Sequence, residues 1–420
     1  LQWNKNNNGT RNANDVFGSI VFSASGNAWI AGGFNNTGTQ MDASVMNYSV
    51  AGTLNWTKNY NGGGDYSESS KKILVDASGN SYSAGNTFSE NQNYNAQLLK
   101  FSSTGALLCQ FTFNGAKSGD DEFTCMTMDN NGNLIAGGYT KVSAHKSDFL
   151  LVKWNPNTCD TFWTTTFDYI QQSDKIIDVT SDASGNIYVT GKSDANTNDS
   201  IVMNDIVTLM YNSSGTLIWN RRFDGASGMN DEPSRIMLDH NGHVIVCGRT
   251  FNGTDDDMVI LSYDQSTGTS IWSNPAIFSY SPSTHERPVD MTIDPSDNIF
   301  ISGYIQDVVS FNEDAAVLKF NSAGVYQNLY YYAGASGGNE RADKVGNDPS
   351  GNVYFAINSD VDADPVLTNY DIMTYKADNN LNLTWTNPMV YSSPVNKDDN
   401  ANDLIVLSDG SVIVGGYTEA

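Results

Sequence analysis

Two stretches of this 420-residue chain place oxygen-bearing side chains at the spacing that wraps a calcium ion. In the first stretch, positions 1, 3, 5 and 12 are Asp194, Asn196, Asn198 and Asp205. In the second stretch, the same positions are Asp360, Asp362, Asp364 and Asp371. Alternating oxygen ligands followed by an acid at position 12 are typical of an EF-type loop, although its sixth position is normally glycine and here is not. The sequence therefore predicts Ca²⁺ as the one candidate cofactor, with solvated acidic loops as the alternative.

Eight more acidic residues recur at one position of an internal repeat and form a second candidate site. They are Asp15, Glu68, Asp121, Asp174, Asp231, Glu286, Glu340 and Asp399. If the strands that they open surround a common axis, the carboxylates form an acidic ring that attracts a cation or a basic partner. The alternative is that each carboxylate accepts backbone hydrogen bonds in its own turn.

The sequence gives little support for catalytic chemistry. The four cysteines form no CxxC pair, and their spacing fits either buried free thiols or one to two disulfides. The four histidines provide too few converging ligands for zinc. With 47 Asp and Glu residues, a glycosidase-like acid pair arises by chance. We therefore expect no catalytic residues and no enzyme activity, with a carbohydrate-active hydrolase or lyase as the alternative.

A short phrase returns eight times in the chain, at steps of 53 to 59 residues. Its clear copies occupy residues 25–32, 78–85, 131–138 and 184–191, and weaker copies follow around residues 242, 297, 351 and 410. In each copy, a glycine stands six residues after the first residue of the Gly-Asn pair or of the pair that replaces it, except where Ile357 takes that place. A repeat of this length indicates one supersecondary unit per copy.

The residues of one repeat predict four strands. Residues 174–180 and 187–190 are rich in β-branched and aromatic residues, and Asp182 and Gly185 between them are typical of a hairpin turn. Third and fourth strands follow over 205–211 and 215–219. A tryptophan recurs about four residues after the second turn, at Trp56, Trp163, Trp219, Trp272 and, slightly shifted, Trp385, whereas Cys109 and Asn328 replace it in two copies.

Radial packing of such four-stranded units buries both faces of each sheet, whereas a linear β-solenoid usually has shorter coils. The sequence thus predicts an all-β fold: a single-domain, eight-bladed β-propeller of four-stranded antiparallel blades over residues 1–420. We expect blades at 15–64, 65–119, 120–173, 174–230, 231–284, 285–339 and 340–398, with the eighth made from 399–420 and 1–14.

The two ends of the chain are expected to complete that eighth blade. Leu1–Trp3 matches Leu54–Trp56, so the N-terminal strand is expected to join the C-terminal blade and close the ring. One strand of this blade is still missing. We therefore expect the native chain to continue beyond Ala420, with a three-stranded last blade as the alternative.

The phrase at 182–191, Asp-x-Ser-Gly-Asn-x-Tyr-Val-x-Gly, resembles the SBBP (beta-propeller) repeat, and the resemblance extends over essentially the whole chain. It implies a secreted or surface-exposed bacterial protein, often one exported by type IX secretion, and it brings no general catalytic motif. Residues 214–219 and 267–272 are similar to fragments of quinoprotein propellers, which implies a quinone-dependent enzyme as a further alternative.

Charge and composition limit the partners. The chain has 22 Lys and Arg against 47 Asp and Glu, a net charge of −25, which disfavours binding to nucleic acid or to an anionic membrane surface. No apolar run is long enough to span a membrane. We expect a non-catalytic binding or scaffold module for a protein or glycan at a bacterial surface, stabilised by calcium or part of a larger assembly. Its variable loops over 86–95, 139–147, 192–204, 250–256, 304–313 and 358–370 would contact the partner.

Overall fold

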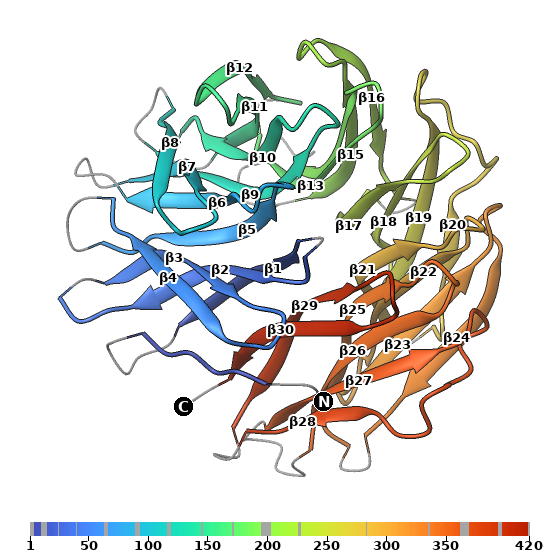
Figure 1. Cartoon of the computed structure of the whole chain (residues 1–420). Helices are drawn as coiled ribbons and strands as arrows, with labels where there is room; N and C mark the ends of the chain where they lie inside the picture. The colour runs from blue at the N-terminus through green and yellow to red at the C-terminus, as the bar shows by residue number, and fades with distance from the viewer. Residues whose placement is uncertain are drawn as a thin grey trace. The chain divides into compact units, whose positions relative to one another are not determined.

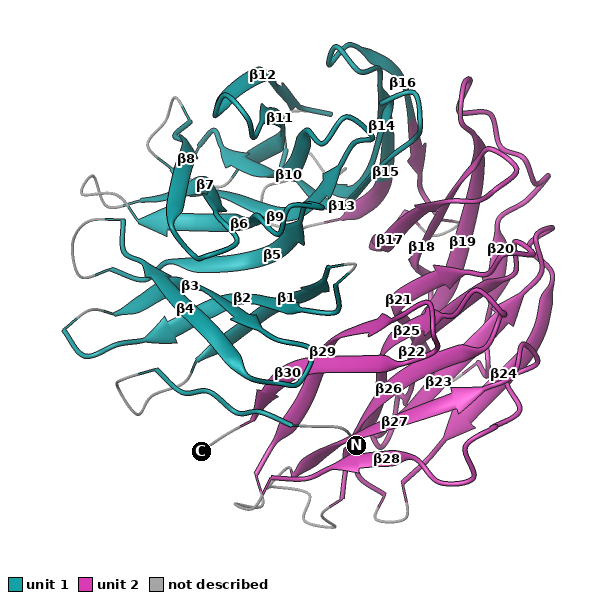
Figure 2. Ribbon diagram, viewed as in Figure 1, with its two compact units in different colours: residues 1–202, 207–220 teal, residues 203–206, 221–420 magenta. Residues whose placement is uncertain are grey.

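The computed structural model describes residues 4–9, 15–23, 25–38, 40–62, 66–88, 93–115, 119–143, 146–169, 172–194, 203–225, 228–282, 284–334, 337–361, 369–393 and 397–418. Over these residues the chain forms strands and no helix. It divides into two compact units, residues 1–202 with 207–220 and residues 203–206 with 221–420 (Figure 2).

The first unit contains three four-stranded antiparallel sheets and most of a fourth, each with its strands in chain order (Figure 1). The first two sheets are β1 (Val16–Phe22), β2 (Ala28–Asn35), β3 (Met41–Tyr48) and β4 (Leu54–Tyr60), then β5 (Ser69–Val75), β6 (Ser81–Phe88), β7 (Tyr94–Phe101) and β8 (Leu107–Phe113). The third and fourth are β9 (Asp121–Met128), β10 (Leu134–Lys141), β11 (Ser147–Asn155) and β12 (Asp160–Phe167), then β13 (Asp174–Ser181), β14 (Ile187–Asp194), β15 (Asn204–Tyr211) and β16 (Leu217–Phe223).

The second unit contains three more four-stranded sheets and a final two-stranded one. Two of the sheets are β17 (Asp231–Leu238), β18 (His243–Phe251), β19 (Asp256–Asp264) and β20 (Ala276–Phe278), then β21 (Thr284–Ile293), β22 (Ile299–Asp307), β23 (Glu313–Phe320) and β24 (Tyr326–Tyr332). The others are β25 (Glu340–Asn347), β26 (Val353–Asp360), β27 (Tyr370–Ala377) and β28 (Met389–Tyr391), then β29 (Asp399–Val406) with β30 (Val412–Thr418).

The chain is therefore an all-β propeller with seven four-stranded blades, and the prediction of eight is wrong. In the described part of the chain, β29 pairs only with β30, so the eighth repeat forms a hairpin and not a blade. The predicted closing strand at residues 1–3 lies outside the described residues, and residues 4–9 form no strand. We number the blades 1 to 7 in chain order and call the strands of each blade A to D.

The hairpin between strands A and B follows the predicted turn chemistry. The Oδ1 atom of Asp182 accepts hydrogen bonds from the backbone N–H groups of Ser184 and Asn186, both at 2.9 Å. Its Oδ2 atom accepts the Asn186 side-chain amide at 2.8 Å and the Tyr188 hydroxyl at 3.0 Å. One aspartate thus satisfies the whole turn, which explains why the motif recurs.

The recurring glycine of strand B has a different cause. Strand A carries a β-bulge at the same repeat position in every blade and in β29. The glycine pairs with the residue just before the bulge, except in blade 7, where Ile357 takes its place. A Cβ atom on Gly138 would lie 1.8 Å from the carbonyl oxygen of Glu122. At Gly138 the bulge brings the two backbones so close that a side chain would clash.

The apolar core consists of separate clusters between neighbouring blades. Blades 2 and 3 enclose Leu98, Phe123 and Trp154, all fully or almost fully buried, and blades 3 and 4 enclose Ile176 with Val189. Blade 3 therefore buries its two faces against two different neighbours, which explains the nearly continuous apolar composition of its strands B and C.

Candidate functional site

A tryptophan on the D segment of one blade covers the turn between strands C and D of the next blade. The indole of Trp56 in blade 1 lies on Gly105 of blade 2, where an added Cβ atom would be 2.8 Å from the ring. The Trp56 Nε1–H donates a hydrogen bond to the carbonyl oxygen of Ser103 at 3.0 Å. The same contact recurs in Trp163 over Gly215 and Trp272 over Gly324. At these three junctions the tryptophan therefore joins one blade to the next.

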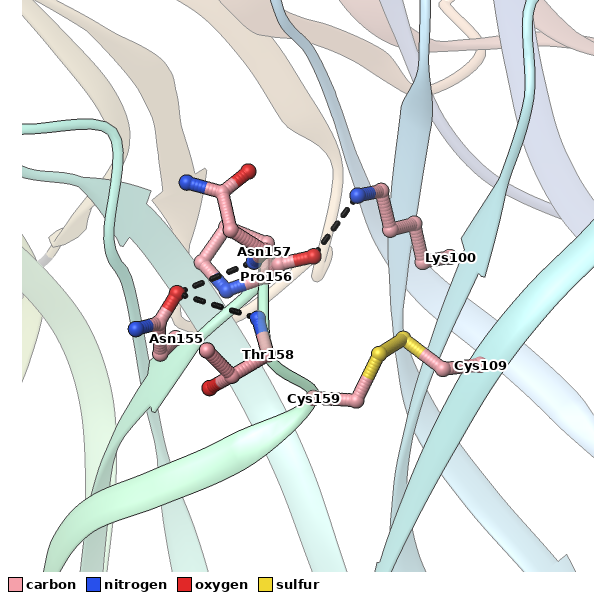
Figure 3. Close-up of a disulfide and its surroundings, with 7 residues drawn as sticks. All are labelled: Lys100, Cys109, Asn155, Pro156, Asn157, Thr158 and Cys159. Carbon is pink, nitrogen blue, oxygen red and sulfur yellow. Dashed lines mark hydrogen bonds between the residues drawn. A yellow bond between two sulfur atoms is a disulfide. The ribbon is translucent and has the colours of Figure 1, made fainter.

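A disulfide replaces this contact between blades 2 and 3 (Figure 3). Cys109 stands in the tryptophan position, and Cys159 stands at the turn position with the positive φ of 65° that glycine has elsewhere. Beside the disulfide, the Lys100 ammonium group donates a hydrogen bond to the carbonyl oxygen of Pro156 at 2.6 Å. Between blades 6 and 7 the Asn328 side chain takes the same place and donates to the carbonyl oxygen of Asn380.

Both alternatives for the cysteines occur in the structure. Cys109 and Cys159 are paired, whereas Cys125 and Cys247 are buried free thiols. Burial raises the pKa of the Cys125 thiol, which makes it a poor nucleophile. The sequence does carry a signal for this pairing, because Cys159 precedes Trp163 by the same four residues that separate a turn glycine from its tryptophan.

The recurring acids at the start of strand A are buried in the blades. All are at most 1% exposed except Asp15, which is half-buried. The carboxylate of Asp121 accepts the backbone N–H of Gly115 at 2.7 Å, and that of Asp231 accepts the N–H of Gly225 at 2.6 Å. Equivalent bonds from the preceding loop reach Asp15, Asp174, Glu340 and Asp399. Each of these carboxylates thus holds the loop that leads into its own blade or into β29.

The glutamates at this position bind protons unusually tightly. Burial raises the pKa of Glu68 to about 7, of Glu286 to about 8 and of Glu340 to about 7. An acid on strand C of the preceding blade raises each pKa further: Asp42, Asp257 and Asp314, respectively. Near neutral pH these positions can therefore hold either a proton or an unbalanced charge.

At two junctions a third acid joins the strand A and strand C acids. Asp148, Asp168 and Asp174 place carboxylate oxygens within 4.8 Å of one another in the first unit. Asp205, Asp224 and Asp231 do the same in the second unit. Such groups of converging oxygen atoms are the ligands that hard divalent cations prefer.

The two predicted calcium loops are described only at their edges. Asn196, Asn198, Asp362 and Asp364 lie outside the described residues. Asp194 is buried, and its backbone N–H donates a hydrogen bond to the carbonyl oxygen of Ser173. A carboxylate oxygen of Asp360 accepts the backbone N–H of Asn369, and Asp371 is buried in strand C. Calcium in these loops therefore stays a prediction.

Blades 5 and 6 share a charged network that the sequence did not indicate. The buried carboxylate of Asp256 pairs with Arg249 at 2.9 Å and with Arg287 at 2.7 Å. The His285 Nδ1 atom accepts the backbone N–H of Asp256 at 2.9 Å, and Arg249 also pairs with Glu232 at 3.0 Å. The positive groups are thus balanced by acids, so the network fits a structural role between the two blades.

Strand D carries several of the exposed apolar side chains of the first unit. Leu108, Phe162 and Ile218, on β8, β12 and β16, are 51%, 54% and 49% exposed. Each lies three residues after the positive-φ residue of its turn. Strand D is the last strand of its sheet, so one of its edges has no strand partner in that sheet. An exposed edge with apolar side chains is the kind of surface that other chains recognise.

One shallow pocket of about 170 Å³ lies in the second unit, among Arg221, Tyr263, Trp272 and Asn274. Its volume is smaller than that of typical ligand cavities, about 300–1,000 Å³. The described residues include no helix of the length and apolarity needed to cross a membrane.

No family model and no curated protein matches the sequence. Many solved structures are similar in fold, including a protein called Sqt1 and a polysaccharide lyase. Sqt1 from Chaetomium thermophilum is 8% identical with a TM-score of 0.52, covering 90% of this chain and 88% of its own. The polysaccharide lyase Uly1 is 12% identical with a TM-score of 0.50, covering 86% of this chain and 90% of its own. At such identities the likeness concerns the fold alone.

Proposed function

We propose that this protein is a non-catalytic binding and scaffold module at a bacterial surface, with a protein as its partner. The single observation that carries the proposal is the set of exposed apolar side chains on strand D of successive blades, Leu108, Phe162 and Ile218. On each of these blades, a partner strand or loop can pair with the open edge of strand D and cover its exposed apolar side chain.

Rigid connections between blades support a display role. Side chains of one blade are bonded to turns of the next through Cys109–Cys159 and through the Trp56 indole. Because binding then orders little of the framework, little of the interaction free energy is lost to entropy. The SBBP-like repeat and the disulfide support secretion, since disulfides persist in oxidising compartments.

The test compares partner binding by three proteins. We expect the triple variant Leu108→Ser, Phe162→Ser, Ile218→Ser to fold normally, because the three side chains are exposed. It should lose a partner that the unchanged protein captures from the producing cells, with affinity reduced by about 10-fold or more. The control variant, Gln110→Ser with Thr164→Ser, changes exposed polar residues of two of these strands and should bind normally.

Two outcomes would contradict the proposal. If the captured protein bound the triple variant as tightly as the unchanged protein, the strand D surface would not be its site. If a panel of polysaccharides were bound or cleaved while no protein was captured, a glycan-binding or carbohydrate-active function would replace it.

A further inference from the structure

A buried lysine of blade 6 contacts a side-chain amide of blade 7. Lys319 lies on β23 and is 7% exposed, and its Nζ atom donates a hydrogen bond to the Oδ1 atom of Asn379. The Nδ2 atom of the same amide donates to the Oδ2 atom of Asp294 at 2.5 Å. Asp294 directly follows β21 of blade 6 and is 1% exposed. All three residues belong to the second unit (Figure 2), so an amine, an amide and a carboxylate from two blades form one chain of contacts.

The equivalent residues of blades 3 and 4 are arranged differently. There the Nζ atom of Lys153 pairs directly with the turn aspartate of its own blade, Asp129, at 2.9 Å. Ser213 stands where blade 7 has Asn379, and Lys153 reaches its backbone carbonyl oxygen at 3.4 Å. In blade 6, by contrast, the amide of Asn379 lies between the lysine and the aspartate and contacts both.

The surroundings of this contact favour a reaction between the amine and the amide. The Nζ atom of Lys319 lies 5.8 Å from the centre of the fully buried Phe300 ring, so little water reaches it. Exclusion of water protects a reacting amide from hydrolysis. The junction also lacks the recurring tryptophan, because Asn328 takes its place. At the other junction without it, the Cys109–Cys159 bond joins the two blades covalently.

We propose that Lys319 and Asn379 become joined by an isopeptide bond, which links blade 6 covalently to blade 7. After the lysine has lost a proton to solvent, its Nζ atom attacks the Cγ atom of Asn379. The Nζ–Cγ bond forms, the Cγ–Nδ2 bond breaks, and one proton passes from Nζ to Nδ2, which leaves as ammonia. No oxidant or reductant is needed, because the nitrogen of one amide replaces that of another.

The geometry assigns a role to each partner in this reaction. The hydrogen bond from Nζ to Oδ1 holds the amine one bond away from the carbon that it attacks, and such proximity replaces a bimolecular encounter. Asp294 is the catalytic acid–base, because its carboxylate touches the departing nitrogen. Once Nζ is bonded to Cγ it stands beside Nδ2, so the same carboxylate can take the proton from one nitrogen and give it to the other.

Mass spectrometry of the reduced and denatured full chain tests the bond directly. The unchanged protein should be lighter than its sequence by one ammonia. Trypsin should fail to cut after Lys319 and should release one branched peptide that contains both Lys319 and Asn379. The variant Asn379→Ser recreates the side chain of blade 4 at a half-buried position, so it should fold, keep the full sequence mass and be cut after Lys319.

A matched pair of variants tests the role of the carboxylate. Asp294→Asn should slow bond formation by about 100-fold or more, as loss of a general acid–base does. Asp129→Asn makes the same change in the equivalent turn of blade 3 and should leave the bond between Lys319 and Asn379 complete. Equal linkage in Asp294→Asn and in the unchanged protein would contradict the role given to Asp294.

The unchanged protein alone can overturn the proposal, even if a variant folds poorly. Full sequence mass with complete cleavage after Lys319, also after prolonged incubation at mildly alkaline pH, would do so. So would an ammonia loss that peptide mapping places elsewhere, for example in a succinimide at Asn131 before Gly132. Because the bond needs no binding partner, its test and the test of the proposed function can fail separately.

Discussion

Cys109 of blade 2 is bonded to Cys159 of blade 3 at the position where Trp56 of blade 1 covers Gly105 of blade 2. The two contacts use the same places in the repeat, a D-segment residue and the centre of the following turn. A covalent bond and an aromatic contact thus perform the same task at neighbouring junctions. The first two predictions follow from this equivalence.

Reduction of the disulfide should destabilise the first unit. The bond closes a loop across a sequence separation of 50 residues, for which a loss of about 2–4 kcal/mol in the free energy of unfolding is typical. Denaturant titration with and without a reducing agent measures this loss. The variant Cys109→Trp with Cys159→Gly recreates the contact of the other junctions and should be insensitive to the reductant. If reduction left the unfolding midpoint of the unchanged protein in place, the bond would not stabilise the fold.

A methyl group at the turn under a tryptophan should cost more than the same group at an open turn. Gly105 and Gly132 have similar φ values of 81° and 77°, but only Gly105 lies under an indole, and an added Cβ on Gly132 meets nothing within 4 Å. We expect Gly132→Ala to lower the free energy of unfolding by about 1 kcal/mol through backbone strain, and Gly105→Ala by about 3 kcal/mol, because overpacking is added. Equal losses for both variants would show that the tryptophan contact contributes nothing.

Stability should fall as the pH rises from mildly acidic to mildly alkaline values. The pKa of Glu286 is about 8 in the folded protein against 4.5 for an unperturbed glutamate, and Glu68 and Glu340 are also raised, to about 7. Between these values the folded state binds more protons than the unfolded state. Each group therefore lowers the free energy of unfolding by up to about 1.4 kcal/mol per pH unit until its folded pKa is passed.

Melting temperatures between about pH 5 and pH 9 test this sign. Glu286→Gln imitates the protonated form and should raise the melting temperature near pH 9 while changing it little near pH 5. Asp160→Asn, at an exposed position, is the matched control. A melting temperature that rises with pH in the unchanged protein would mean that these glutamates ionise without cost.

The sequence alone determined the local structure of the repeat. The turn around Asp182 depends only on residues within six positions, and a glycine such as Gly191 opposite the bulge is favoured by two strands that are adjacent in the chain. Such features are visible as spacing because the residues that interact are close in sequence. This is why the strands, their turns and the propeller class could be predicted.

Contacts between repeats were decided by the tertiary structure. The Cys109–Cys159 bond and the meeting of Asp148 with Asp174 both depend on how one sheet packs on the next, which hairpin patterns do not encode. The blade count failed for the same reason, since the eighth repeat has the A–B hairpin pattern but, within the described residues, no third and fourth strands to complete its sheet. A repeat pattern reports what each unit can form, whereas the number of completed sheets depends on which strands pair across the chain.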